Sequence, residues 1–459
     1  MTAEGERARA PASSTNALRS APAADVAPPV APNLVRPREI PGARHVGRNT
    51  LEILVFRGLS TPLALVLVVL QSRFLEPSGR GAYVLAVLTV TIFSRLLGQL
   101  GVAAANRLRE EAGETRELVQ RALALGALTG AAAIPLIALF GAYAADIGTD
   151  VALLAALALI PNVIWQTISG VLLGLARIRL WNYIQLGSPL LTTVGLVALV
   201  VWLDAGVRGA VLAWTVANVV TAALALVATR DLWLPLRLPR LGDRTGRMLA
   251  RLAVTMGAVQ VVNLVSYRIE LFVLDRYRGL DDVGIYSIAM QAAEAMWLIA
   301  AAVANAVIAP AVHESDRGAA RIVGRGSVRA LLITAGVGAL VALLAPFAIP
   351  AIFGEAFDGA SRPLLLLLPG VVLYAPVSVL VVYLSVRRGR PELSLMVALA
   401  GMALTLGAAI VLIPDHGSAG AAVASTIGYA AGALLAWFFF VRLSRTHEHD
   451  PGHYERGPG

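Results

Sequence analysis

The sequence lacks two residue types altogether and is poor in charge. Its 459 residues include no cysteine and no lysine, so all 38 basic side chains are arginine, and charged residues make up only 15 % of the chain. The absence of cysteine excludes disulfides, thiol catalysis and cysteine-based metal sites. A soluble globular domain carries about 25 % charged residues, so the shortage of charge excludes an ordinary soluble enzyme.

Hydrophobic residues are correspondingly abundant. They account for 57 % of the chain, and the mean hydropathy is +0.72. A membrane-spanning helix needs about 20 apolar residues, so this composition allows roughly a dozen. The apolar runs show no strand-type alternation and predict an all-α polytopic membrane protein with twelve transmembrane helices, at 51–72, 82–105, 120–143, 150–175, 181–203, 208–228, 249–274, 283–311, 327–349, 361–385, 392–413 and 418–441.

Composition also divides the chain into segments. Residues 1–49 are rich in Ala, Pro and Arg without an apolar run, which predicts a disordered cytoplasmic tail and no secretory signal. The connection 229–248 separates a six-helix bundle at 50–228 from a second at 249–441, and residues 442–459 form another cytoplasmic tail. No segment could fold as a nucleotide-binding domain, so we expect no ATP hydrolysis and no enzymatic activity.

Arginine is distributed unevenly over the connections between the predicted helices. When an arginine within two residues of a predicted helix end is counted with the adjoining connection, the two tails and the even-numbered connections carry 29 arginines, the odd-numbered connections carry 6, and 3 lie inside helices. Cytoplasmic loops are enriched in positive charge. We therefore expect both termini on the cytoplasmic side.

The two six-helix halves resemble each other in sequence. Residues 73–83 match residues 276–286 at a constant offset of 203, and the basic turns at 177–179 and 388–390 match at an offset of 211. Two similar halves in the same orientation are the layout of many secondary transporters, in which the substrate path lies between two bundles. The alternative is a gene duplication that is kept only for packing.

The matched stretches carry a family resemblance. Arg73-Phe74-Leu75-Glu76-Pro77-Ser78-Gly79-Arg80-Gly81-Ala82-Tyr83 resembles the first hairpin of bacterial polysaccharide-biosynthesis flippases, and 267–270, 284–286 and 352–357 are similar to later elements of that family. These flippases belong to the multidrug/oligosaccharidyl-lipid/polysaccharide exporter superfamily. The resemblance covers about residues 50–441 and implies a flippase for a lipid-linked oligosaccharide in the bacterial cytoplasmic membrane. Glu76 and Glu270 depart from the usual Gly and Asp.

Polar side chains at membrane depth are energetically costly, so each of them is a candidate for function. Several recur at helical spacing on the second, seventh and eighth predicted helices, and a stripe that faced lipid would be unfavourable. We therefore expect them to face a central cavity shared by the first two helices of each half. The candidate substrate-binding residues are Arg57, Arg95, Gln99, Asn106, Asn263, Arg268, Glu270, Gln291, Glu294 and Asn305.

Arginine in such a cavity suits an anionic pyrophosphate, because the planar guanidinium donates paired hydrogen bonds and stays charged. The expected partners are a lipid-linked anionic glycan and membrane lipids, with polysaccharide assembly proteins as a further candidate. We expect no nucleic acid, metal or cofactor. The competing interpretation is structural bracing, with Arg95 paired to Glu294 and Arg268 paired to Glu270 or Asp275.

Other functions stay open on the sequence alone. A cation-coupled exporter of small molecules predicts an acidic cavity with little arginine, and a flippase for the cell-wall precursor usually has two further helices. A membrane-bound polymerase or glycosyltransferase needs a longer outer loop than this chain has, and a non-transporting scaffold needs no charge at the midplane.

Overall fold

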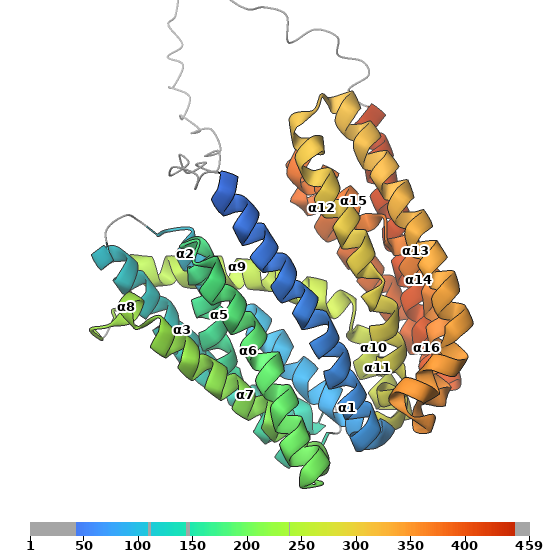
Figure 1. Cartoon of the computed structure of the whole chain (residues 1–459), viewed down its shortest axis with the longest axis horizontal. Helices are drawn as coiled ribbons and strands as arrows, with labels where there is room; N and C mark the ends of the chain where they lie inside the picture. The colour runs from blue at the N-terminus through green and yellow to red at the C-terminus, as the bar shows by residue number, and fades with distance from the viewer. Residues whose placement is uncertain (1–42, 109–111, 144–146, 238, 446–459) are drawn as a thin grey trace, which may run out of the picture. The chain divides into compact units, whose positions relative to one another are not determined.

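The computed structural model describes residues 43–108, 112–143, 147–237 and 239–445, and the described chain contains helices and no strand. The first half contains α1 (Ala43–Leu97), α2 (Leu100–Ala105), α3 (Ala112–Tyr143), α4 (Thr149–Ala156), α5 (Leu159–Gly174), α6 (Ile178–Leu196), the π-helix η1 (Val197–Trp202), α7 (Gly206–Ala228) and α8 (Arg230–Trp233). The second half contains α9 (Arg244–Ser266), α10 (Ile269–Arg278), α11 (Leu280–Ala295), α12 (Trp297–His313), α13 (Asp316–Phe353), the 3-10 helix η2 (Glu355–Ala360), α14 (Ser361–Tyr374), α15 (Val377–Val381), the π-helix η3 (Val382–Arg387) and α16 (Pro391–Arg445). Figure 1 traces these helices in chain order.

Ten helical segments of the described chain are long and apolar enough to cross a membrane, and two of them fold back on themselves. In α1 the chain turns at Glu76, whose φ is 58°. Arg80 then donates to the carbonyl of Val68 at 3.3 Å, although a straight helix would separate these residues by about 18 Å. In α16 the turn is at Gly417, where φ is 54°. The two hairpins bring the number of crossings to twelve, which confirms the predicted fold class.

The observed helix ends differ from the predicted ones in two ways. Helix α1 begins at Ala43, inside the predicted tail, whose residues 1–42 lie outside the described chain. The predicted spans 249–274 and 283–311 are each broken inside, between α9 and α10 at Tyr267–Arg268 and between α11 and α12 at Met296. Neither break has a Pro or Gly beside it, so hydropathy gave no sign of them.

The connection between the halves is fixed to α3. Gln120 donates to the carbonyl oxygens of Trp233 at 2.6 Å and Pro235 at 2.8 Å. Arg121 pairs with Asp243 at 2.6 Å, and Asp243 caps α9 by accepting from the Gly246 amide at 2.7 Å. The first half therefore holds the start of α9, although α9 belongs to the second half in sequence.

The two repeated hairpins meet each other directly. Gly81 lies against the carbonyl of Leu280, and Gly284, its counterpart 203 residues later, lies against the carbonyl of Pro77. Pro77 and Leu280 are themselves 203 residues apart, so the two contacts are counterparts of each other in the repeat. A methyl group on either glycine would collide with backbone, so this close approach requires glycine on both sides.

Candidate functional site

Arg268 and Glu294 form an ion pair at the break between α9 and α10. Arg268 Nη2 donates to Glu294 Oε2 at 2.7 Å, and Arg268 Nη1 contacts the other carboxylate oxygen, Oε1. Nη1 also donates to the Tyr267 carbonyl at 3.0 Å. The side chains are 22 % and 17 % exposed, so the pair is largely removed from solvent but not sealed. A bidentate ion pair of this kind fixes the relative orientation of the two side chains and keeps both of them charged.

A cavity of about 380 Å³ lies between the halves, and Arg268 is its charged wall residue. The first half contributes α1, α6 and α7, and the second half contributes α9, α10 and α11. Its polar side chains include Gln71, Tyr83, Arg268 and Gln291, and most of the other lining is aliphatic. The cavity therefore combines one cation and amide groups with apolar walls, which suits a molecule that has both an anionic and a greasy part.

Glu270 lies behind this cavity in a fully buried position. The Tyr286 hydroxyl donates a hydrogen bond to Glu270 Oε1 at 3.2 Å, and its oxygen lies 3.0 Å from Ser425 Oγ. The second carboxylate oxygen, Oε2, is buried and has no hydrogen-bond partner. A carboxyl group with one satisfied and one free oxygen can take up a proton or a small cation.

Arg80 is a buried charge that the sequence prediction missed. Its side chain has no exposed surface, and its guanidinium donates to Ser287 Oγ at 2.9 Å and to Gln71 Oε1 at 3.0 Å. Within the described chain it contacts no carboxylate, and its Nη2 is unpaired. Arg80 is the single charged residue between Pro77 and Ser94, which was the available signal. Because Ser287 belongs to the second half, Arg80 joins the two hairpins.

The structure groups only some of the ten candidate residues. Arg268 and Gln291 line the cavity between the halves, Glu294 and Glu270 lie near it, and Asn263 lines a second cavity. Arg95, Asn106 and Asn305 are exposed and Gln99 is buried. The side chain of Arg57 lies outside the described residues, although its backbone is in α1.

Helix breaks explain why the predicted stripes separate. The end of α1 at Leu97 falls between Arg95 and Gln99, and the break at Met296 falls between Glu294 and Asn305. A stripe requires one continuous helix, so residues on opposite sides of a break do not share a face. The proposed pairing of Arg95 with Glu294 is also wrong, because the ion-pair partner of Glu294 is Arg268. Arg268 takes both oxygens of Glu294, and neither Glu270 nor Asp275 is its ion-pair partner.

The second cavity, of about 500 Å³, lies inside the second half. Three aromatic rings form its inner wall, from Tyr267, Trp297 and Tyr374. The ring centroids of Tyr267 and Trp297 are 5.2 Å apart, and the hydroxyls of Tyr267 and Tyr374 are 3.0 Å apart. Tyr267 and Arg268 are adjacent in sequence, yet they line different cavities.

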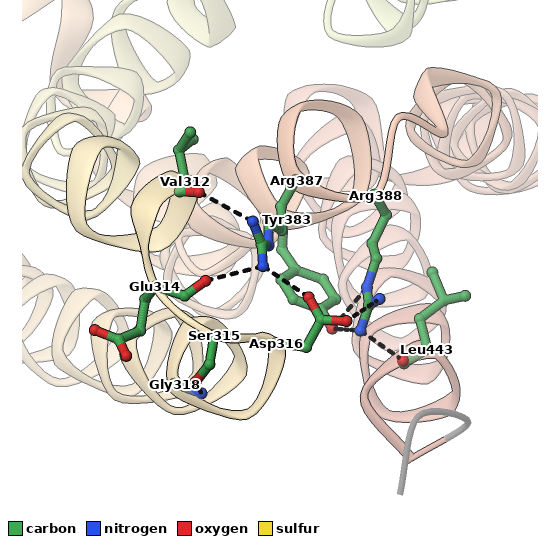
Figure 2. A network of polar contacts seen from close by, with 9 residues as sticks. All are labelled: Val312, Glu314, Ser315, Asp316, Gly318, Tyr383, Arg387, Arg388 and Leu443. Atoms are coloured by element: carbon green, nitrogen blue, oxygen red, sulfur yellow. Dashed lines mark hydrogen bonds and ion pairs between the residues drawn. The ribbon is translucent and has the colours of Figure 1, made fainter. Parts of the chain in front are cut away.

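A polar network ties the predicted cytoplasmic end of the second half together (Figure 2). Arg387 donates to Asp316 at 2.8 Å and to the carbonyls of Val312 and Glu314. Arg388 reaches the Tyr383 hydroxyl at 2.6 Å and the Leu443 carbonyl at 3.2 Å. These contacts fasten α12, α13, η3 and α16 to one another.

The equivalent turn of the first half has a simpler contact. Arg177, 211 residues before Arg388, pairs with Asp231 at 2.7 Å, and both side chains are about half exposed. The hydrogen bond from Arg177 and the charge of its guanidinium hold the pKa of Asp231 below its ordinary value. The two basic turns therefore occupy equivalent positions in the two halves, but Arg388 makes more contacts than Arg177.

Comparison with known proteins gives a family and a fold. Residues 46–316 match the sequence model of a family described as polysaccharide biosynthesis protein. No curated protein sequence matches the chain. Lipid II flippase MurJ in an inward closed conformation is similar with a TM-score of 0.72 at 12 % identity, over 85 % of this chain and 89 % of that one.

Two conformations of a multidrug resistance MATE family transporter of the MOP superfamily are also similar. The inward-facing one has a TM-score of 0.70 at 18 % identity, over 85 % of this chain and 96 % of that one. The outward-facing one has a TM-score of 0.56 at 17 % identity, over 88 % and 96 %. These matches show that the fold is that of MOP-superfamily transporters.

Proposed function

The chain belongs to the polysaccharide biosynthesis protein family, and from this premise we propose that it moves a lipid-linked oligosaccharide from the inner to the outer leaflet of the bacterial cytoplasmic membrane. The bundles at 50–228 and 249–441 rock against each other, joined by the cytoplasmic linker 229–248. Both termini face the cytoplasm, in keeping with the 29 arginines on that side.

The contacts between the halves support an inward-facing state. Under this orientation the hairpin contact of Gly81 with Gly284 is on the outer side. Arg73 adds an outer contact by donating to the Ile352 carbonyl at 3.0 Å, and the rings of Phe140 and Phe272 add another at 5.5 Å. A closed outer side and a cavity between the halves are what alternating access requires before substrate binds.

The observation that carries the proposal is the cation on the wall of this cavity. Arg268 is neutralised by Glu294 in this structure, so the cavity holds no net charge from this pair. A pyrophosphate also offers two oxygen acceptors to the planar guanidinium and can replace the carboxylate on Arg268. Binding would then release Glu294, which links the presence of substrate to a change in the contacts between α10 and α11.

A direct assay of lipid translocation tests the proposal. Purified protein in proteoliposomes should move a fluorescent lipid-linked oligosaccharide between leaflets, and the Arg268→Ala variant should not, at equal reconstitution. The matched control is Leu65→Ala, at the equivalent position of the first half. Equal translocation by wild type and Arg268→Ala would overturn the proposal.

A cation-coupled exporter of small molecules is the second candidate, and the free oxygen of Glu270 is the observation that favours it. In that case Glu270→Gln should abolish efflux of small cationic dyes by the same proteoliposomes, and translocation of the glycolipid should be absent in wild type. Translocation of the glycolipid without dye efflux excludes this candidate.

A further inference from the structure

The cavity inside the second half has a mostly apolar lining. No ionisable side chain of the described chain lines it apart from tyrosine, and most lining residues are Ala, Val, Leu or Pro. Its hydroxyl groups already have partners. Ser378 donates to the Ala375 carbonyl at 2.9 Å, and Ser385 and Ser394 bond each other at 2.7 Å. Trp297 Nε1 is buried without a hydrogen-bond partner, and apart from this donor and the Asn263 amide the wall offers few polar atoms to a ligand.

The length of the cavity matches one leaflet of a bilayer. It extends along the chain from Tyr374, at the end of α14, to Ser385 in η3. Eleven residues of helix correspond to about 16 Å, and half of a hydrocarbon core of about 30 Å is about 15 Å. Pro391, at the predicted cytoplasmic start of α16, lines the same end as Ser385. Under the proposed orientation, the cavity thus runs from the cytoplasmic surface toward the middle of the membrane.

A hydrocarbon chain suits this cavity better than water or empty space. A water molecule needs two or more polar partners, and beyond the Trp297 Nε1 donor and the Asn263 amide the wall offers few. An empty volume of about 500 Å³ forfeits the packing contacts of its whole lining. A hydrocarbon chain restores those contacts and needs no hydrogen bond.

The position of the cavity relative to Arg268 indicates which hydrocarbon tail the cavity holds. On α9 and its end, Asn263 and Tyr267 face the apolar cavity, whereas Leu264 and Arg268 face the cavity between the halves. A molecule with a phosphate joined to a long tail can therefore set its phosphate at Arg268 and its tail one residue away. We propose that the cavity between α9, α12 and α16 holds the polyisoprenyl tail of the lipid-linked substrate, which rests on the proposed function.

Because the chain has no native cysteine, a single introduced cysteine can be alkylated selectively after folding, and the attached group then fills the cavity. Ala301 lines it, whereas the next residue of α12, Ala302, does not, and both residues are exposed and accessible to a maleimide. Ala301→Cys and the control Ala302→Cys are purified, placed in nanodiscs and alkylated with a bulky aliphatic maleimide. Each is then exposed to light with a long polyisoprenyl diphosphate that carries a diazirine in its tail, and labelled peptides are identified by mass spectrometry.

The expected result is labelling of residues around Trp297, Ser378 and Val397, which falls about tenfold after alkylation of Ala301→Cys and is unchanged in alkylated Ala302→Cys. Labelling that survives alkylation at position 301 overturns the proposal. Equal labelling of these peptides by phosphatidylglycerol with a diazirine in its acyl chain also overturns it, since the site would then hold bulk lipid.

A short-chain diphosphate separates this inference from the proposed function. Geranyl diphosphate with a diazirine should label peptides near Arg268 with or without the plug at position 301. Loss of that signal in wild type counts against the phosphate site and hence the proposed function. Its presence, with tail labelling insensitive to the plug, counts against the tail cavity alone.

Discussion

The two halves of the chain share their scaffold but not their charges. At the repeat offset of 203, Arg268, Glu270 and Glu294 of the second half correspond to Leu65, Leu67 and Thr91 of the first. Gln291, on the wall of the shared cavity, corresponds to Leu88, which lines the same cavity. The second half therefore contributes a charged residue to the cavity wall, whereas the first half contributes only uncharged ones.

A cluster of polar groups inside the first half is neutral and serves packing. Asn218 Oδ1 accepts from Asn162 Nδ2 at 2.8 Å and from Trp165 Nε1 at 2.9 Å, and Gln166 donates to Asn162. Buried amides that satisfy one another fix the arrangement of helices without creating a charge. The comparison shows that the hairpin contacts preserve the duplicated architecture, whereas the charges beside the shared cavity, Arg268, Glu270 and Glu294, lie in the second half.

The largest expected effect comes from removing the cation of the charged wall. Arg268→Ala should reduce translocation of the glycolipid at least about 100-fold, because phosphate loses its paired donor and Glu294 is left as a partly buried, unpaired charge. Leu65→Ala should change it less than about threefold. Translocation in proteoliposomes, normalised to protein, measures both.

The double variant Arg268→Ala with Glu294→Ala distinguishes binding from bracing. It leaves no lone charge, so a purely structural pair predicts that activity returns. A substrate-binding Arg268 predicts a well-folded double variant that is still inactive. Full activity of the double variant contradicts the role we assign to Arg268.

The next effect tests whether the hairpin contact is symmetric. Gly81→Ala and Gly284→Ala each place a methyl group against backbone of the other half, so both should open the outer side and by similar amounts, about 1–3 kcal/mol. The readout is labelling of Ser78→Cys by an impermeant maleimide, which should quicken in both variants. A change in one variant alone would show that the two contacts are not equivalent.

A smaller difference is expected at the cytoplasmic turns. Arg388→Ala removes contacts to Asp316, Tyr383 and Leu443 and should lower the free energy of unfolding by about 2–3 kcal/mol. Arg177→Ala breaks one exposed pair and should cost less than about 1 kcal/mol. Thermal unfolding in detergent measures the difference, and equal losses would contradict the contrast between the turns.

The smallest effect is the pH dependence of the exposed pair. Because Arg177 lowers the pKa of Asp231 in the folded protein, the pair stabilises it above the ordinary carboxyl pKa, and this contribution disappears as the pH falls through the lowered value. Asp231→Asn should therefore unfold slightly earlier than wild type at pH 7 and at the same temperature at about pH 2. A difference that persists unchanged in acid would exclude the pair as its source.

Hydropathy and the repeat predicted the twelve crossings and the hairpins, because both depend on local sequence. The breaks at Tyr267–Arg268 and Met296 depend on tertiary packing within uninterrupted apolar runs, so they could not be predicted. The break at Met296 separates Asn305 from Glu294, and the end of α1 at Leu97 separates Arg95 from Gln99 and Asn106. Arg80 was overlooked because it follows a Gly in a predicted connection, where an arginine normally meets solvent.

The exchange of contacts between Gly81–Leu280 and Gly284–Pro77 has the form of an interface between two identical subunits about a two-fold axis. In a homodimer of one six-helix chain, any substitution occurs twice, and an arginine on the cavity wall would face its own copy across the axis. Joining the copies in a single chain removes that constraint. Covalent fusion therefore makes it possible for Arg268 to be matched by Leu65 rather than by a second arginine, and for a cavity with two-fold ancestry to bind an asymmetric molecule in one orientation.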